Sequence, residues 1–303
     1  MLDVMCDTTT ETSVIAERTS CDPNAVERFV RVDDVDMHVV ENGMPDAPAL
    51  LLLSNAAAPA AIWDPVVPLL ATAHRIIRVD LLGVGTSAGS GGTYDVPTWA
   101  RRLAVVLGRL GMTRVTVIGH SSGCMLATSL AEQQPGLVAA LALIDMGPSL
   151  SAKLPESLLF RLLLAPLTGR LLWRLRTENS IRKAARSGVA RPVDIPDAFI
   201  VHAQRLTLQD FAGAMRASTD YLAERSLTDR LIPLGLPLLV IFGAEDGRWR
   251  SSSAAAYRVV PGARVELLRG VGHTPMMEDP QTTGKLLLDF AAIAPQLTVS
   301  PPA

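Results

Sequence analysis

The feature that most constrains this 303-residue chain is a repeated change of period, from short apolar runs to segments with helical spacing. A continuous apolar run is typical of a strand buried on both faces, because a strand with one face in water would alternate apolar and polar residues. Strands that alternate with helices predict a mostly parallel central sheet flanked by helices, the α/β class. We predict core strands at 49–55, 74–80, 114–119, 140–147, 237–243 and 263–270, and helices at 96–111, 123–134 and 282–292.

Two segments break this alternation and define the predicted domains. Residues 1–26 are rich in Thr, Ser and Asp and have no periodicity, so we expect a mobile N-terminal tail. Residues 148–236 are long, rich in leucine and arginine, and without strand-like runs. They predict a helical cap inserted above the carboxyl ends of the strands, where α/β sheets bind ligands. The core is then 27–147, beginning with two short strands around Asp33, together with 237–303.

Composition and charge exclude several classes of partner. A net charge of -2 gives no reason to expect nucleic acid, and no apolar run reaches the roughly 18 residues of a membrane span. The three cysteines have no metal-type spacing and fit a reducing compartment. The N-terminus does not have the pattern of a signal peptide, so we expect a cytoplasmic protein with a small-molecule substrate. A strong bias for arginine over lysine suggests a bacterial origin; no oligomeric state is predicted.

A candidate nucleophile lies in the segment VTVIGHSSGCM, residues 115–125. Here Gly119-His120-Ser121-Ser122-Gly123 matches G-x-S-x-G, with a predicted strand before it and a predicted helix after it. In that setting the central serine lies on a strained turn that exposes its hydroxyl group. Only Ser121 has glycines two residues before and two residues after it, so we predict Ser121 and not Ser122 as the nucleophile. The alternative is a purely structural turn.

A serine nucleophile needs a base, and the base needs an acid that fixes its tautomer. Five histidines compete for the role of base: His38, His74, His120, His202 and His273. We predict His273, because it follows the last strand in a loop where strand ends converge, and we expect the His120 ring to point away from the serine. Asp246 follows the preceding strand and gives the chain order Ser-Asp-His. Asp145 and Glu245 remain alternative acids.

With these residues the chain resembles the α/β-hydrolase superfamily, in the form of a serine hydrolase with a helical cap, from about Glu27 to Ala292. The resemblance implies the α/β-hydrolase fold. IIRVDLLGVGTS matches the family's D-x-x-G-x-G-x-S loop, with Asp80, Gly83, Gly85 and Ser87. GHTPMMEDP matches its G-H-x-x-x-x-E-x-P segment, with Gly272, His273, Glu278 and Pro280. We expect Glu278 and Asp279 to anchor this loop and the start of the last helix.

One segment departs from the family pattern. Ser54-Asn55 stands where the family commonly has His-Gly, and it is similar to the Ser-Asn of 3-oxoadipate enol-lactonases. By position, the oxyanion donors would be the backbone amides of Ala56 and Ser122. Asn tolerates positive φ better than most non-glycine residues, and we favour this conformational role for Asn55. The alternative is that the Asn55 side chain turns inward and touches the substrate.

The insertion is expected to set specificity. We predict Trp63 at the mouth of the pocket, with Asn55 and His120 as further substrate-binding residues. An apolar lining is expected from Leu150, Leu154, Leu158, Leu159, Leu162, Leu163 and Leu164. Arg161, Arg170, Arg174 and Arg176 suit either a surface that meets lipid or, as we expect, solvated helix faces.

The predicted activity is hydrolysis of a small, largely apolar ester or lactone through an acyl-enzyme, with no metal and no organic cofactor. Haloalkane dehalogenase and epoxide hydrolase members of the family carry Asp at the elbow, so a serine there argues against chemistry on halides or epoxides. The same triad would also serve C–C bond or thioester hydrolysis. An alternative of another class is a non-catalytic binding protein with the hydrolase fold.

Overall fold

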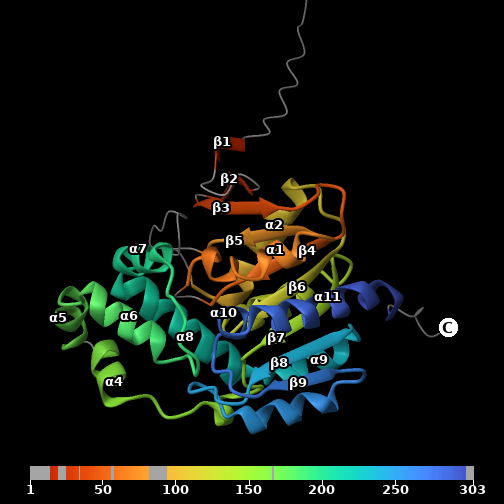
Figure 1. Ribbon diagram of the computed structural model, residues 1–303. Coiled ribbons are helices and arrows are strands. Elements are labelled where there is room, and N and C mark those ends of the chain that lie inside the picture. The colour runs from red at the N-terminus through yellow and green to blue at the C-terminus, as the bar shows by residue number, and fades with distance from the viewer. Residues whose placement is uncertain are drawn as a thin grey trace, which may run out of the picture.

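In a computed structural model, nine strands form one sheet in the order β1-β2-β3-β5-β4-β6-β7-β8-β9 (Figure 1). The structure describes residues 14–19, 25–33, 35–55, 58–81, 94–165 and 167–297. Pairing is antiparallel from β1 to β5 and parallel from β5 to β9. The strands are β1 (Val14–Thr19), β2 (Ala25–Val32), β3 (Val35–Asn42), β4 (Ala49–Leu53), β5 (Arg75–Val79), β6 (Val115–His120), β7 (Val138–Ile144), β8 (Leu238–Gly243) and β9 (Arg264–Leu268).

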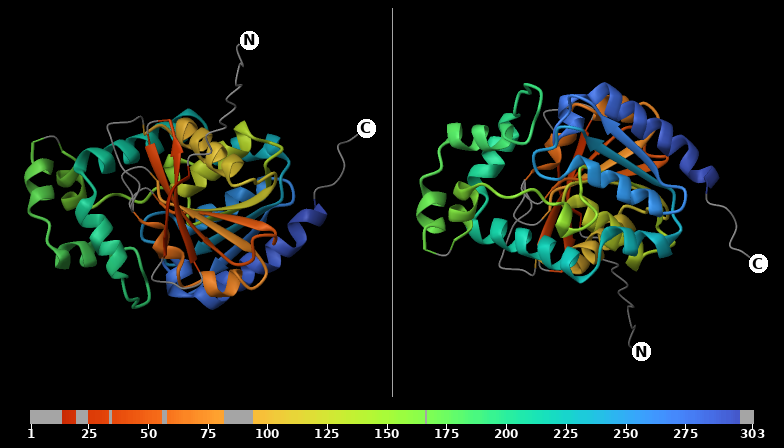
Figure 2. Two further views of the ribbon diagram at one scale, coloured as in Figure 1. Left: turned by 90° about the horizontal axis from the view of Figure 1, so that it is seen from above. Right: turned by 90° about the horizontal axis from the view of Figure 1, so that it is seen from below.

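Helices cover both faces of the twisted sheet (Figure 2). One face packs against α2 (Val96–Arg109), α3 (Gly123–Gln133), α9 (Leu227–Leu231) and the 3₁₀ segment η4 (Ser251–Val259), and the other against η1 (Ala60–Trp63), α1 (Val67–Leu70), α10 (Pro275–Glu278) and α11 (Pro280–Leu297). Strand β4 shows why both faces need cover. Leu51 and Leu53 point into the first core and Leu50 and Leu52 into the second, so every side chain of this run is buried. The predicted α/β class and mostly parallel sheet are confirmed.

Local signals place the elements close to where the sequence predicts them. Helix α2 begins after Asp95, whose side chain accepts a hydrogen bond from the Thr98 amide at 2.9 Å, and Gly111 has a φ of 72° just after its end. Strands β2 and β3 form the predicted hairpin, with Asp33 at a φ of 54° in the turn. The residues that start and stop these elements lie next to the elements in the sequence, so a local pattern predicts them.

Strand β1 lies within the segment that we predicted as a tail. It pairs antiparallel with β2, and β2 itself begins at Ala25, so the tail prediction needs correction for residues 14–19 and 25–26. Without β1, the backbone groups along the outer edge of β2 would be unpaired, so this edge can bind a further strand. Such pairing needs no hydrophobic periodicity in the added strand, which is why no pattern in the sequence predicts β1. The rest of the predicted tail lies outside the described residues.

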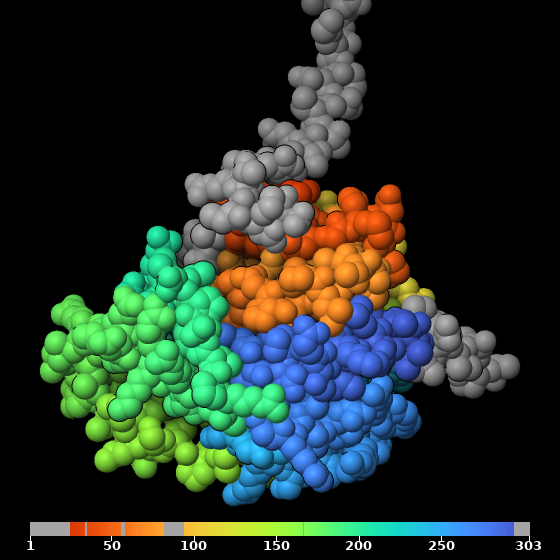
Figure 3. Space-filling model, viewed as in Figure 1, coloured from red at the N-terminus to blue at the C-terminus, as the bar shows by residue number. Residues whose placement is uncertain are grey.

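Five helices follow η2 (Leu150–Ala152) at one end of the sheet, where they form the projecting mass seen in Figures 1 and 3. They are α4 (Leu158–Leu164), α5 (Gly169–Arg174), α6 (Glu178–Arg186), α7 (Asp197–Arg205) and α8 (Leu208–Glu224). The loops after β8 and β9 contact this insertion, through Arg248 to Ser187 and through His273 to Gly188. In the described part of the chain, no helix is long and apolar enough to cross a membrane.

Candidate active site

Ser121 lies on a turn that only its neighbouring glycines permit. It follows β6 directly and has a φ of 53°, in the left-handed region that non-glycine residues rarely adopt. A Cβ at Gly119 would lie 2.6 Å from the Gly123 carbonyl carbon, and a Cβ at Gly123 would lie 2.4 Å from the Leu53 carbonyl oxygen. The Ser121 amide donates to the Ile144 carbonyl at 2.8 Å, which holds the strained residue in place.

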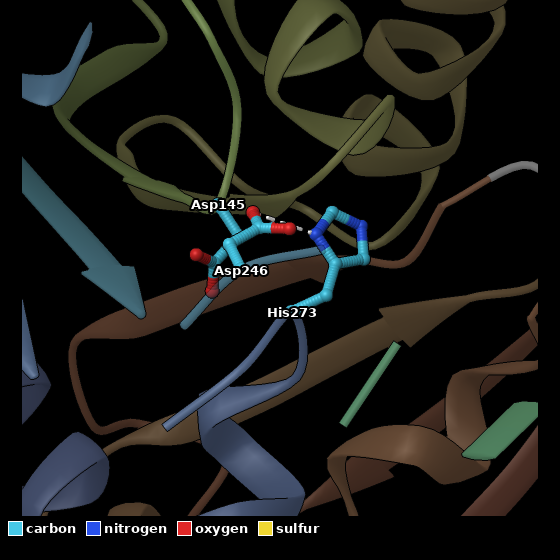
Figure 4. A group of neighbouring side chains, drawn as sticks. All are labelled: Asp145, Asp246 and His273. Carbon is cyan, nitrogen blue, oxygen red and sulfur yellow. Dashed lines mark hydrogen bonds and ion pairs between the residues drawn. The ribbon is translucent and has the colours of Figure 1, made fainter. Parts of the chain in front are cut away.

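His273 and Asp246 complete a hydrogen-bonded chain from this serine. The His273 Nε2 lies 3.1 Å from the Ser121 Oγ. The His273 Nδ1 lies 3.0 Å from the Asp246 Oδ2, and Figure 4 shows this second hydrogen bond. Because Asp246 accepts the proton on Nδ1, Nε2 is left as the acceptor that faces the serine hydroxyl. The structure thus brings together the three residues that the sequence predicts as a catalytic triad.

The two acidic neighbours after β8 have different partners. Besides His273, Asp246 accepts the backbone amides of Arg248 at 2.6 Å and Trp249 at 3.3 Å through its Oδ1, and its side chain is fully buried. Glu245 instead accepts the backbone amide of Val271 at 3.1 Å. Of the two, Asp246 is the one oriented towards the base.

Asp145, the other candidate acid, lies beside Asp246 and not on the histidine. It ends β7 with a φ of 50°, is fully buried, and accepts the Gly243 amide at 2.7 Å. Burial first, and then the charge of Asp246, raise the pKa of the Asp145 carboxyl group well above its usual value. Figure 4 shows the two carboxyl groups side by side, with Asp246 bonded to His273. Asp145 therefore holds its proton more strongly than an ordinary aspartate does.

The same three residues have the composition of a metal site, since one ligand atom from each of Asp145, Asp246 and His273 lies within 4.8 Å of the others. Both Asp246 oxygens and one Asp145 oxygen already accept hydrogen bonds from N–H groups, however. Asp246 accepts three of them and Asp145 accepts one. A bound cation would have to break the His273–Asp246 hydrogen bond, so the arrangement suits a triad better than a metal centre.

The loop that carries His273 is fixed by Glu278. Its carboxylate accepts the amides of Gly272 at 2.8 Å and Thr274 at 3.0 Å, the residues on either side of the histidine. Asp279 accepts the Thr282 amide at 3.2 Å at the start of α11. Both acids therefore anchor their segments as expected from the sequence.

The insertion also holds this loop, which the sequence did not predict. The His273 amide donates to the Gly188 carbonyl at 2.7 Å, and Glu278 accepts the amides of Ala190 at 2.8 Å and Arg191 at 3.1 Å. These partners lie more than 80 residues apart in the chain. No local pattern marks such a contact.

His120 joins three loops of the site and does not face a substrate. It is fully buried, and its Nε2 donates to the His273 carbonyl at 2.7 Å while its Nδ1 lies 3.4 Å from the Asn55 Nδ2. Burial lowers the pKa of His120 to about 3, so the ring is neutral and its Nδ1 acts as an acceptor. The substrate contact that we predicted for His120 is corrected to a contact between loops.

The Ser-Asn segment does not have the backbone conformation that we favoured from its sequence, and a substrate contact of the Asn55 side chain stays a prediction. Asn55 is not among the described non-glycine residues with positive φ, so the favoured conformational role is wrong. Its side-chain amide points towards His120, because the neutral imidazole offers it an acceptor.

Of the two predicted oxyanion donors, Ala56 lies outside the described residues. Ser122 is the N-cap residue of α3, which places its backbone at the positive end of that helix.

Trp63 and several leucines lie elsewhere than expected. Trp63, the last residue of η1, is fully buried in the core with its ring nearly perpendicular to that of His120, so the predicted position at a pocket mouth is corrected. An apolar aromatic side chain suits either a pocket mouth or a buried core, and Trp63 packs in the core. Helix α4 buries none of its residues, and Leu158, Leu159 and Leu162 are exposed to solvent instead of lining a pocket.

Asp80 holds the start of η1 from the neighbouring strand end. Its carboxylate accepts the Ala60 amide at 2.7 Å and lies 2.8 Å from the His38 Nδ1. It therefore fixes the segment that follows Ala56. Gly83, Gly85 and Ser87, the rest of the matched loop, lie outside the described residues.

Comparison with known proteins agrees with this geometry. The model of a family described as "Alpha/beta hydrolase family" matches residues 50–284. The pimeloyl-[acyl-carrier protein] methyl ester esterase of Aeromonas hydrophila is 28% identical over 247 residues, which cover 80% of this chain and 95% of that protein. A putative carbamate hydrolase, RutD, of Stutzerimonas stutzeri is 28% identical over 259 residues, 82% of this chain and 93% of that one. The crystal structure of Cfl2 from Burkholderia cenocepacia superimposes with a TM-score of 0.76 at 28% identity, covering 91% of this chain and 99% of that one.

Proposed function

Because the chain belongs to the alpha/beta hydrolase family, we propose that it is a serine-dependent hydrolase of a small, largely apolar ester or lactone. The observation that carries this proposal is the continuous path of hydrogen bonds from Ser121 through His273 to Asp246. Serine on a strained elbow, with a base 3.1 Å away, is arranged for nucleophilic attack on a carbonyl carbon.

In the first half of the proposed reaction, the Ser121 Oγ attacks the carbonyl carbon while His273 Nε2 takes the hydroxyl proton. Asp246 stabilises the imidazolium that forms but does not itself take the proton. When the tetrahedral intermediate collapses, the C–O bond to the alcohol breaks and His273 returns its proton to the leaving oxygen. The acyl group is then esterified to Ser121.

In the second half, His273 takes a proton from water, and the resulting hydroxide attacks the acyl carbon. Collapse releases the acid and returns the proton to the Ser121 Oγ. We propose the backbone amides of Ala56 and Ser122 as the oxyanion donors, each worth about 10²–10³ in rate. The contact with His120 holds the side chain of Asn55, the residue before Ala56 in the sequence, and we assign the α4–α8 helices the role of a cap over the strand ends.

The names of the relatives favour acyl chemistry. One relative is named as a methyl ester esterase and another as a putative carbamate hydrolase, and both names describe cleavage at a carbonyl group.

The test is a panel of p-nitrophenyl esters of increasing acyl length, together with simple lactones, thioesters and β-diketones, assayed with the wild-type protein and Ser121→Ala. We expect turnover of short-chain esters or lactones that is lost in Ser121→Ala. Turnover of thioesters or β-diketones alone would move the function to the neighbouring reaction classes. Binding without turnover of any carbonyl compound would contradict the proposal and favour a binding protein.

A further inference from the structure

The α4–α5 pair, residues 157–177, has the composition of a buried segment, but many of its leucine side chains are exposed to solvent. These residues contain nine leucines, one phenylalanine, one tryptophan and four arginines, and no acidic residue. A leucine-rich helix normally buries its apolar face against a protein core. Helix α4, with the sequence LLFRLLL, buries none of its residues.

The exposed leucines extend from one helix of the pair to the other. Leu158 and Leu159 are 70% and 67% exposed on α4, and Leu167 between the helices is 93% exposed. Leu171 in α5 and Leu175 just after it are 62% and 65% exposed. Figures 1 and 2 place both helices at the outer end of the insertion, away from the sheet. A cluster of apolar side chains of this kind on one protruding element marks a contact surface.

Unpaired positive charge accompanies the leucines. Arg161, Arg170 and Arg174 are exposed, and none of them forms an ion pair with a described residue. Elsewhere in the described part of the insertion, Arg182 and Arg230 each pair with two carboxylates. The arginines of the pair are therefore available to an anion outside the chain.

A pocket of about 440 Å³ adjoins α5 and is also lined by arginines. Arg174, Arg176 and Arg205 contribute to its wall together with Trp173. The Arg176 guanidinium stacks on the Trp173 ring at 3.4 Å from the ring centroid and donates to the Leu206 carbonyl, which fixes its plane. Such a wall suits an anionic group carried by a larger molecule.

We propose that the α4–α5 pair docks this protein on an anionic lipid surface, with the leucines at the acyl-chain boundary and the arginines at the headgroup phosphates. Leucine and tryptophan beside arginine on short helices is the composition of a segment that lies in a membrane interface without spanning the membrane. A second copy of the chain is a poorer partner, because a symmetric contact would place the same arginines against one another.

The experiment is flotation of the full-length protein with vesicles of phosphatidylcholine alone, or of equal parts phosphatidylcholine and phosphatidylglycerol. Trp173 reports the contact directly, because the other three tryptophans, Trp63, Trp99 and Trp249, are buried. We expect flotation with the anionic vesicles only, and quenching of Trp173 by brominated lipid in those vesicles.

Two variants and a matched control separate charge from apolar contact. Arg161→Gln/Arg170→Gln/Arg174→Gln should weaken binding on the order of 100-fold. Leu167→Ser/Leu171→Ser/Leu175→Ser should abolish the quenching. Arg258→Gln with Leu267→Ser, exposed positions outside the insertion, should bind like the wild type.

No flotation with anionic vesicles would overturn this proposal, as would flotation that both variants leave unchanged. Sedimentation showing a dimer that the leucine variant dissociates, without vesicle binding, would assign the surface to a second copy. The proposed hydrolysis is tested separately. Ser121→Ala should still bind vesicles, and the leucine variant should still hydrolyse a soluble p-nitrophenyl ester.

Discussion

The loops at the strand ends and the α4–α5 pair are built in opposite ways. Around the triad, His273, Asp246 and Asp145 are buried, and each is held by hydrogen bonds to backbone amides or carbonyls. On the α4–α5 pair, leucines face solvent and arginines lack ion-pair partners among the described residues. Catalysis needs distances fixed to a fraction of an ångström, whereas docking needs side chains that remain free to meet a partner. The difference separates a region that does chemistry from one that makes contacts.

The largest expected effect is the loss of activity on changing the triad residues in the loops at the strand ends. Ser121→Ala and His273→Ala should each lower kcat by about 10⁴–10⁶, because either change breaks the path of proton transfer. The double variant should lose little more, and steady-state kinetics on the best ester of the panel measures all three. If either single variant kept near-normal activity, the triad would be wrongly assigned.

The next effect distinguishes the two buried acids. Asp246→Asn should lower kcat by about 10⁴, because an amide cannot hold the imidazolium or the correct tautomer. Asp145→Asn should cost less than about tenfold, since the amide oxygen can still accept the Gly243 N–H and the change leaves the His273–Asp246 hydrogen bond in place. The opposite order of losses in the same assay would make Asp145 the acid of the triad.

His120, among the loops at the strand ends, makes the stability of the folded protein depend on pH. Its pKa is about 3 in the folded protein and near 6.5 when unfolded, so the unfolded state binds more protons between these values. The contribution of His120 to stability is therefore complete above about pH 6.5 and is lost as the pH falls towards 3, at roughly 1.4 kcal/mol per pH unit. Urea unfolding of the wild type and His120→Gln from pH 7 to pH 4 should show a steeper loss in the wild type. Parallel curves would contradict this role of His120.

The smallest effect is the change in the free energy of unfolding on substituting an exposed leucine of the α4–α5 pair, in contrast to a leucine of the core. Leu51→Ala in β4 should lower the free energy of unfolding by about 2–5 kcal/mol, because it empties a fully buried site. Leu167→Ser should change it by no more than about 0.5 kcal/mol. Chemical denaturation of both variants measures the contrast. A large loss in Leu167→Ser would show that this leucine is covered in the folded protein.

Sequence reasoning succeeded where the signal is local. The strands, the glycine-flanked elbow at Ser121, and the positions of Asp246 and His273 after strand ends depend on neighbouring residues, and the structure places them as predicted. The contacts from Gly188 to His273 and from Asn55 to His120 join residues far apart in the chain, so no local pattern revealed them. The burial of Trp63 and the exposure of the α4 leucines were also not predicted, because composition alone does not say which apolar residues pack into the core.

The most direct test of the central claim is labelling with a fluorophosphonate, followed by intact mass measurement and peptide mapping. The path from Ser121 to His273 and Asp246 predicts one adduct per chain, on Ser121. The adduct should be absent from Ser121→Ala and retained in Ser122→Ala, where the backbone amide survives. A wild-type protein that takes no label, or an adduct that persists in Ser121→Ala, would contradict it.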